Sequence, residues 1–203
     1  MGNKEQEINS ETYFLMGIGI RKTIFAISSY KKILQFELRK FVYGFESANR
    51  TISSLDKVTL VKILKRNGAQ IGNGCDIESG LTFHNCQDYS NLIIGDNTHI
   101  GKNCFFDLAG KTKFGNNVVV SMCTNFITHI NMKKSDLSSL FPGKVGKIYI
   151  GNNTYIGAGV NILMDVELGE NCFVAAGAVV KKSFNSDSFI AGVPAVLKRM
   201  INK

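Results

Sequence analysis

The sequence of 203 residues has no long hydrophobic run. Its longest clean apolar stretch runs from Tyr13 to Ile20, and Arg21 and Lys22 follow directly. A stretch of this length is too short to span a bilayer. No basic segment precedes it and no small-residue cleavage site follows it. We therefore expect neither a membrane-spanning helix nor a secretory signal.

Paired cysteines and clustered histidines are also lacking. The five cysteines are odd in number and none forms a CxxC motif, which argues against a disulfide framework or a zinc site. Free thiols favour a reducing cytoplasm. The three histidines, His84, His99 and His129, are too far apart in the sequence to suggest converging zinc ligands. We expect no metal.

Acidic residues are scarce in the first third of the chain. Residues 1–67 hold 12 Lys and Arg against 6 Asp and Glu, a net charge of +6, whereas residues 68–203 hold 12 against 10. Anionic lipid, a phosphorylated substrate and nucleic acid are partners that such a charge could attract. No nucleic-acid-binding motif is present, so we expect no nucleic-acid partner.

What the sequence does contain is a period of six. The segment from Ile150 to Val180 carries an apolar residue at every sixth position, a spacing that neither a single strand nor a single helix explains. The same spacing occurs upstream, which gives fifteen hexads in five groups of three. Their apolar positions are Ile71, Ile77, Phe83, Ile94, Ile100, Phe106, Phe114, Val120, Phe126, Ile150, Ile156, Ile162, Leu168, Val174 and Val180.

The fourth place of the best-formed hexads indicates a turn. It holds only glycine or asparagine, the residues that best tolerate the left-handed backbone region: Gly74, Asn97, Asn103, Asn117, Asn153, Gly159, Asn171 and Gly177. A turn after every six residues, with an inward apolar residue between turns, predicts a three-sided coil. Five coils stacked about 4.8 Å apart would form a prism with an apolar core. Cys75, Cys104 and Cys172 occupy the small fifth place, where a thiol acts as a small hydrophobe.

These hexads resemble those of the hexapeptide-repeat acyltransferases over roughly residues 68–200. The ending "FIAGVPAVLKRM" is similar to the tail of the maltose, galactoside and surface-polysaccharide O-acetyltransferases. The resemblance implies an all-β fold, a left-handed parallel β-helix. It also implies an acetyl-CoA donor and a homotrimer with its sites between subunits. We expect helical residues 1–67, a β-helix over 68–185 with an extended loop at 127–149, and a tail with a short helix over 186–203.

The repeat breaks where a site is expected. The longest break, from Phe126 to Ile150, carries His129, at the place where the resembling enzymes carry a histidine at the start of an extended loop. A sugar hydroxyl must lose its proton as it attacks a thioester, and imidazole suits that role. His129 is therefore the candidate general base. Some relatives have a second histidine two residues further on, where this chain has Asn131.

The resemblance implies further contacts. Ala158 would lie beside the pantetheine thiol of coenzyme A, and Ala176 along the pantetheine arm. The phosphates would meet Lys181, Lys182 and Arg199, although Val196 replaces a basic residue that relatives often carry. Asp107, at a two-residue bulge in the repeat, resembles the acidic residue that binds the acceptor.

The N-terminal third contains two amphipathic segments. "SSLDKVTLVKILKRNG" predicts a helix capped by Ser53 or Ser54, with Val58, Val61 and Leu64 on one face and Gly68 at its end. "YKKILQFELRKFVYG" places Tyr30, Leu34, Leu38 and Phe41 on one face. We expect that face to pack on its own domain. The alternative is peripheral contact with an anionic membrane through residues 1–67.

Together these features predict an acetyl-CoA-dependent O-acetyltransferase acting on a sugar hydroxyl of a surface-polysaccharide precursor or a small saccharide. The protein would be cytoplasmic, and could be peripheral to the inner membrane. The alternatives are an N-acetyltransferase on an amino-sugar nucleotide, an acetyltransferase on a drug hydroxyl, and a non-catalytic β-helix scaffold. A scaffold would have no need of a histidine at the start of the loop.

Overall fold

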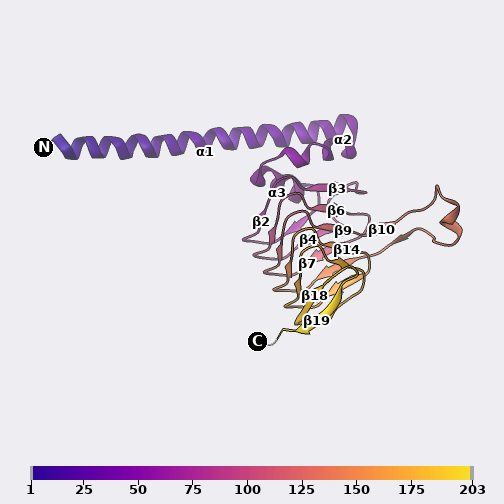
Figure 1. The fold of residues 1–203 in the computed structure, drawn as a ribbon. Coiled ribbons are helices and arrows are strands. Elements are labelled where there is room, and N and C mark those ends of the chain that lie inside the picture. Colours follow the sequence, from indigo (N-terminus) through magenta and orange to yellow (C-terminus); the bar gives the residue numbers. More distant parts are fainter. Residues whose placement is uncertain (1, 202–203) are drawn as a thin grey trace.

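The computed structural model describes the backbone of residues 2–201 and the side chains of residues 19–201. A helical segment precedes a three-sided stack of parallel strands, from which one long loop projects (Figure 1). The helices are α1 (Gly2–Tyr43), α2 (Phe45–Asn49), the 3-10 turn η1 (Ile52–Ser54) and α3 (Lys57–Arg66). The side chains of residues 13–18, most of the apolar run noted above, lie outside the described part.

Three parallel sheets form the sides of the prism, and we name them faces A, B and C in chain order. Face A comprises β1 (Gln70–Ile71), β4 (Leu92–Ile94), β7 (Thr112–Phe114), β12 (Ile148–Ile150) and β15 (Val166–Leu168). Face B comprises β2 (Asp76–Ile77), β5 (His99–Ile100), β8 (Val119–Val120), β13 (Tyr155–Ile156), β16 (Phe173–Val174), β18 (Ser188–Ala191) and β19 (Val196–Met200). Face C comprises β3 (Thr82–His84), β6 (Phe105–Asp107), β9 (Asn125–Ile127), β14 (Asn161–Leu163) and β17 (Val179–Val180).

The hexads produce this stack as predicted. Each successive coil adds one strand to each face, which gives five complete coils and part of a sixth at β18. All eight glycines and asparagines predicted for the turns have positive φ, for example 53° at Asn97 and 68° at Gly159. A residue with a branched side chain would be strained there.

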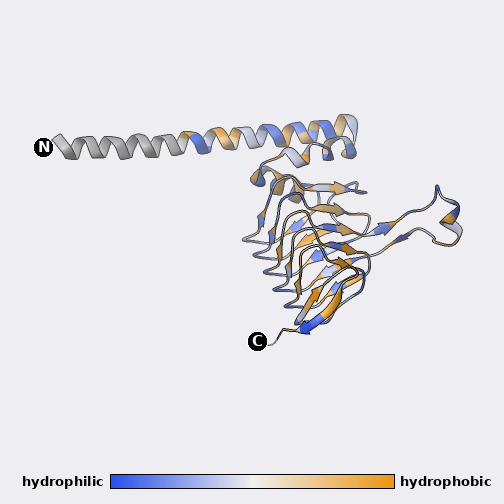
Figure 2. Ribbon diagram, viewed as in Figure 1, coloured by the Kyte–Doolittle hydropathy of each residue, from blue (hydrophilic) through white to orange (hydrophobic). Residues whose placement is uncertain are grey.

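The core is the line of inward apolar residues. Fourteen of the fifteen are buried, and Ile71, in the first coil, is half-buried. In the first three coils the rings of Phe83, Phe106 and Phe126 stack with centroids 5.4 and 5.0 Å apart, and Phe114 meets Phe126 edge-on. Apolar residues recur on the strands of every coil in Figure 2. Each coil thus buries its apolar side chains against the coils above and below.

The C-terminal tail corrects one expectation. Residues 186–203 were predicted to include a short helix, but β19 instead folds back antiparallel on β18. The edge strand β18 would otherwise present unpaired backbone groups, and pairing with β19 satisfies them.

Two expectations for helix α3 also prove wrong, namely its N-cap and its buried face. The N-cap of α3 is Asp56, whose carboxylate accepts a hydrogen bond from the Thr59 backbone N–H at 2.9 Å, and not Ser53 or Ser54. The buried face of α3 is formed by Thr59, Leu60, Ile63 and Leu64, whereas Val58 is exposed. The helix ends before Gly68, as predicted.

The apolar face predicted to pack on the domain does not do so. Tyr30, Leu34, Leu38 and Phe41 are exposed, and it is the opposite side of α1, at Ser29 and Phe36, that is buried. Ser29 lies against α3, where its hydroxyl accepts a hydrogen bond from the Thr59 hydroxyl at 2.8 Å. Among the described residues, none of the helices combines the length and apolar content needed to cross a bilayer.

Candidate active site

Three polar residues lie one above another where the chain passes from face C to face A, which we name the C–A corner. Asn85 follows β3, Asp107 ends β6 and His129 follows β9. Each is 22 residues beyond the one before it, so each occupies the same corner of three successive coils. The irregular steps in the repeat contribute to this, because the first step holds five residues more than a regular coil of eighteen and the next holds two more.

Asp107 is the centre of this group. It is only 1% exposed, and every group that contacts its carboxylate is a donor. Oδ2 accepts hydrogen bonds from Nδ1 of His129 at 2.5 Å and from the Thr128 backbone N–H at 2.9 Å. Oδ1 accepts from the side chain of Asn85 at 3.1 Å and from the Ala109 backbone N–H at 3.3 Å.

The donors around Asp107 keep it ionised. Burial raises the pKa of its carboxyl, but the hydrogen bonds from His129, Asn85 and the backbone outweigh burial, and the pKa lies below its ordinary value. An ionised carboxylate only accepts hydrogen bonds. Nδ1 of His129 must therefore carry the proton of that bond, which fixes the tautomer of the imidazole.

His129 is consequently held with Nε2 able to accept a proton. Its side chain is 28% exposed, so the ring reaches solvent although Asp107 beside it does not. The amide nitrogen of Asn85 lies 3.2 Å from both Nδ1 and Nε2. This arrangement of a buried carboxylate, an oriented imidazole and an Nε2 without a proton of its own is what general base catalysis requires.

A long loop begins at this histidine. β10 (His129–Ile130) pairs antiparallel with β11 (Lys144–Val145), and between them lies the short 3-10 turn η2 (Asp136–Ser139). The loop extends away from the stack in Figure 1. His129 thus lies at the base of the extension, where the loop leaves face C.

The residues predicted to contact coenzyme A separate into two sets. Ala158 and Ala176 lie at the corner between faces B and C, in adjacent coils, and the Gly177 N–H donates to the Ala158 carbonyl at 2.9 Å. Lys181 and Lys182 are exposed and follow β17, at the C–A corner. Arg199 lies on β19, with its guanidinium 5.4 Å from the centre of the Phe189 ring on the face-B side. One chain does not gather these residues into one pocket.

The B–C corner is open to an extended ligand. A Cβ atom added at Gly159 or Gly177 would meet no atom within 4 Å. No large side chain therefore stands over the backbone beside Ala158 and Ala176. The small residues at this corner leave space beside the backbone, and their contact with the pantetheine arm remains a prediction.

Asn85 is the site residue that the sequence reasoning missed. The signal was its place in the five-residue excess after Phe83, one coil before Asp107. The surroundings of Asp107 also differ from its predicted role, because both of its oxygens already hold donors from this chain. Its contact with an acceptor remains a prediction.

A groove of about 800 Å³ opens beside Asn85. Glu46 and Asn49 of α2 lie on one side, and residues 84–87 on the other. Burial, followed by the charges of Asp88 and Asp107, raises the pKa of the Cys86 thiol in this groove to about 11. Cys86 is therefore protonated at neutral pH and is not a nucleophile of this site.

His84 and His99 take no part in the bond between His129 and Asp107, although His84 is in register with Asp107 across β3 and β6 and lines the groove. His99 Nδ1 lies 3.0 Å from the Asp76 carboxylate on face B, and His84 is exposed on face C. Within the part of the chain whose side chains are described, no three His, Cys, Asp or Glu residues converge as metal ligands would.

Comparison with known proteins agrees with the fold. Residues 147–182 match the family model described as bacterial transferase hexapeptide (six repeats), and residues 91–122 match the hexapeptide repeat of succinyl-transferase. A hexapeptide-repeat-containing acetyltransferase from Vibrio cholerae superimposes with a TM-score of 0.67 at 22% identity, over 87% of this chain and 94% of that one. The fold is thus that of the hexapeptide-repeat transferases.

Proteins with similar sequences narrow the assignment from the fold to a family. The galactoside O-acetyltransferase of Escherichia coli is 33% identical over 151 residues, which are 69% of this chain and 68% of that protein. That of Lactococcus lactis is 28% identical over 154 residues, 70% of this chain and 68% of that protein. The chain belongs to the hexapeptide-repeat acetyltransferase family.

Proposed function

We propose that this protein is an acetyl-CoA-dependent O-acetyltransferase that acts on a sugar hydroxyl, with His129 as its general base. The observation that carries the proposal is the bond of 2.5 Å between His129 and the buried Asp107, which holds Nε2 ready for a proton. The galactoside O-acetyltransferases among the relatives favour a sugar hydroxyl as the acceptor.

The proposed reaction moves one proton through His129. Acetyl-CoA supplies the acetyl group as a reactive thioester. Nε2 takes the proton of the acceptor hydroxyl as its oxygen bonds to the acetyl carbon, and returns it to the departing thiolate. The imidazole is cationic between these steps, and the Asp107 carboxylate stabilises that charge. The products are an O-acetyl sugar and free coenzyme A.

The groove beside Asn85 is our candidate for the acceptor site. It joins the side-chain amide of Asn85 to polar groups of α2, and its volume of about 800 Å³ is enough for a saccharide. Hydroxyl groups are both donors and acceptors, which suits the mixture of carboxylate and amide groups at Glu46, Asn49 and Asn85.

The residues that we assign to the site lie on different sides of each prism. His129, Lys181 and Lys182 lie at the C–A corner, whereas Ala158, Ala176 and Arg199 lie at the B–C corner or on face B. Face C, on the order of 10 Å wide, separates the two corners. We propose that the protein is a homotrimer and that the C–A corner of one chain faces the B–C corner of its neighbour. Threefold closure would form three equal grooves.

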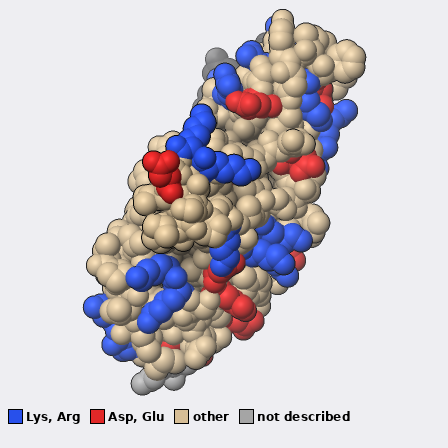
Figure 3. Space-filling view, turned by 90° about the vertical axis from the view of Figure 1, so that its right-hand side faces the viewer, with Lys and Arg blue, Asp and Glu red and all other residues tan. Residues whose placement is uncertain are grey.

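The same arrangement would collect the basic residues. Lys181 and Lys182 lie two coils from His129, about 10 Å further along the same corner. Arg199 of the neighbour would approach from the other wall. Lys and Arg side chains are spread over the whole face shown in Figure 3, its C-terminal end included. We propose that these three residues bind the phosphates of coenzyme A.

We also propose a cytoplasmic location. The five cysteines are free, and Cys104 and Cys172 are buried with no disulfide partner among the described residues. Unpaired cysteines are typical of reducing compartments.

Release of coenzyme A tests the function. The purified protein should release CoA from acetyl-CoA when a sugar with a free hydroxyl is added, in a panel that also holds amino-sugar nucleotides and hydroxylated antibiotics. Mass spectrometry should show an O-acetyl ester. Acetylation of an amine alone, of an antibiotic alone, or of no acceptor in the panel would contradict the proposal.

Mixed trimers test the shared groove. Chains with His129→Ala and chains with Ala158→Trp should each be inactive alone, because the first lacks the base and the second fills the open corner. Mixed trimers would contain grooves that pair the intact His129 of one chain with the intact Ala158 of another. Activity should return above that of either parent. No recovery in verified mixed trimers, or a fully active monomer in sedimentation analysis, would exclude a site between subunits.

A further inference from the structure

Helix α1 presents an apolar stripe that nothing in the described structure covers. Seven residues form it, spaced three or four apart so that they share one face, and they are 57–88% exposed: Ile20, Ile24, Ile27, Tyr30, Leu34, Leu38 and Phe41. The domain packs against the opposite face, at Ser29 and Phe36. The stripe is therefore not needed for the packing of α1.

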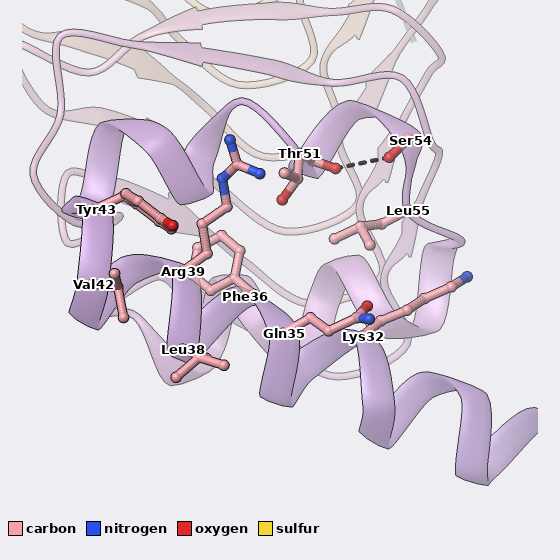
Figure 4. Close-up of a pocket in the computed structure, with 10 residues that line it drawn as sticks. All are labelled: Lys32, Gln35, Phe36, Leu38, Arg39, Val42, Tyr43, Thr51, Ser54 and Leu55. Carbon is pink, nitrogen blue, oxygen red and sulfur yellow. Dashed lines mark hydrogen bonds between the residues drawn. The ribbon is translucent and has the colours of Figure 1, made fainter.

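The stripe faces outward at one end of the molecule. Figure 1 shows α1 running across the end of the stack of coils and extending beyond it, and not along the stack. Figure 4 shows Leu38 on the side of α1 away from the overlying strands. A flat surface could therefore meet the whole stripe at once, with the coils pointing away from it.

The charge of this part of α1 is strongly positive. Between residues 19 and 43 the only acidic residue is Glu37, against six basic residues: Arg21, Lys22, Lys31, Lys32, Arg39 and Lys40. Three of them contact the domain, since Lys32 pairs with Asp56, Lys40 donates to Asn67 and Arg39 donates to Ser47. Arg21, Lys22 and Lys31 are exposed, and Lys31 lies within the stripe itself.

We propose that α1 binds the surface of a membrane that contains anionic phospholipid, with its apolar stripe in the interface between headgroups and acyl chains. A long lysine side chain in the stripe can reach up to the headgroup phosphates while its stem stays in the apolar region. This inference does not depend on which acceptor the site acetylates.

A second copy of α1 is the occupant that these charges disfavour. Two such helices packed along their stripes would bring their positive charges together and would bury Lys31 at the seam, where a lysine costs stability. The same positive charges are attracted to an anionic membrane surface. This attraction contributes about 1 kcal/mol of binding free energy per basic residue near the surface.

A hollow beside the stripe extends the apolar surface. It measures about 630 Å³ and lies between α1 and the segment around η1, with Phe36, Leu38, Val42 and Leu55 among its lining residues (Figure 4). Lys32 also lines it. The apolar side chains on its walls have the chemistry to receive an acyl chain of a phospholipid.

Co-sedimentation with vesicles tests the proposal with the whole chain of 203 residues. Binding is expected to vesicles of phosphatidylcholine mixed with phosphatidylglycerol, and not to phosphatidylcholine alone, and added salt should weaken it. Ile27→Ser together with Leu34→Ser should lower binding by about 10-fold or more, because both side chains would leave the interface. The matched control is Phe25→Ser, an exposed apolar residue of α1 that lies off the stripe, and it should bind like the wild type.

Two kinds of result would contradict membrane binding by α1. Absence of binding to the anionic vesicles, or equal binding by the wild type and the stripe variant, would overturn the proposal. Sedimentation without vesicles should give particles of the same size for both. A smaller particle for the stripe variant would show that the stripe joins copies of the chain, and that too would overturn it.

Discussion

Replacing His129 by alanine should lower the rate of acetyl transfer by about 10²–10⁴-fold, the usual contribution of a general base. The change removes Nε2, and with it the group that accepts the hydroxyl proton. The side chain is part-exposed and lies beyond the buried core, so the fold should persist. Binding of acetyl-CoA should also persist, because the residues proposed to hold it lie elsewhere. Steady-state rates, calorimetric titration with CoA and circular dichroism measure the three quantities.

The matched control is His99→Ala. His99 also contacts a carboxylate, that of Asp76, but it lies on face B away from the C–A corner. Its removal should leave the rate within about 2-fold, since surface pairs contribute little. A His129→Ala variant with wild-type activity would remove His129 from the mechanism. An equal loss in His99→Ala would show that the effect comes from the fold.

The repeat could be predicted because its signals are local. An inward residue such as Phe126 or Ile162 and a turn residue such as Asn117 or Gly177 are each required by one hexad, whatever the rest of the chain does. Fifteen repetitions then leave few other folds that bury all the apolar residues. This explains why all eight turn residues and nearly the whole core agree with the prediction.

The helical segment could not be predicted in the same way. α1 has apolar residues on two faces, with Phe36 on one and Leu34 and Leu38 on the other. Periodicity shows both faces but not which of them the first coil will meet. The short helix predicted for the tail was wrong for a related reason. The segment Val196–Met200 becomes a strand only because β18 offers it an open edge, and a partner distant in sequence decides that.

The candidate site could be predicted in part. His129 could be proposed from the loop that follows it, because a break in a regular repeat is visible in the sequence. Its partnership with Asp107 depends on how many residues each coil holds, and the extra residues after Phe83 and Phe106 bring Asn85 and Asp107 into line with it. Such irregular steps have no general rule, so the alignment becomes evident only in the structure.

Replacing Asp107 by asparagine tests what that partnership does. Each group around the carboxylate is a donor, so the amide must turn its own donor toward one of them, and the negative charge beside His129 is lost. If Asp107 positions the base and stabilises its cation, kcat should fall by on the order of 10²-fold, with little change in KM. If Asp107 instead binds the acceptor, KM for the acceptor should rise while kcat changes less. The free energy of unfolding should also fall, by about 2–4 kcal/mol.

The pH dependence of this variant follows from the lowered pKa of Asp107. A carboxyl with a lower pKa in the folded state stabilises the protein fully above its unfolded pKa of about 3.9, and that contribution is lost as the pH falls through the lower, folded pKa. The difference in the free energy of unfolding between wild type and variant should therefore narrow as the pH falls below about 3.9, which chemical denaturation at a series of pH values measures. Asp165→Asn is the matched control, because Asp165 lies at the same corner, also has a lowered pKa, and pairs with Lys144 in solvent. It should retain wild-type kcat, and a loss equal to that of Asp107→Asn would mean that negative charge at the corner, and not contact with His129, supports the reaction.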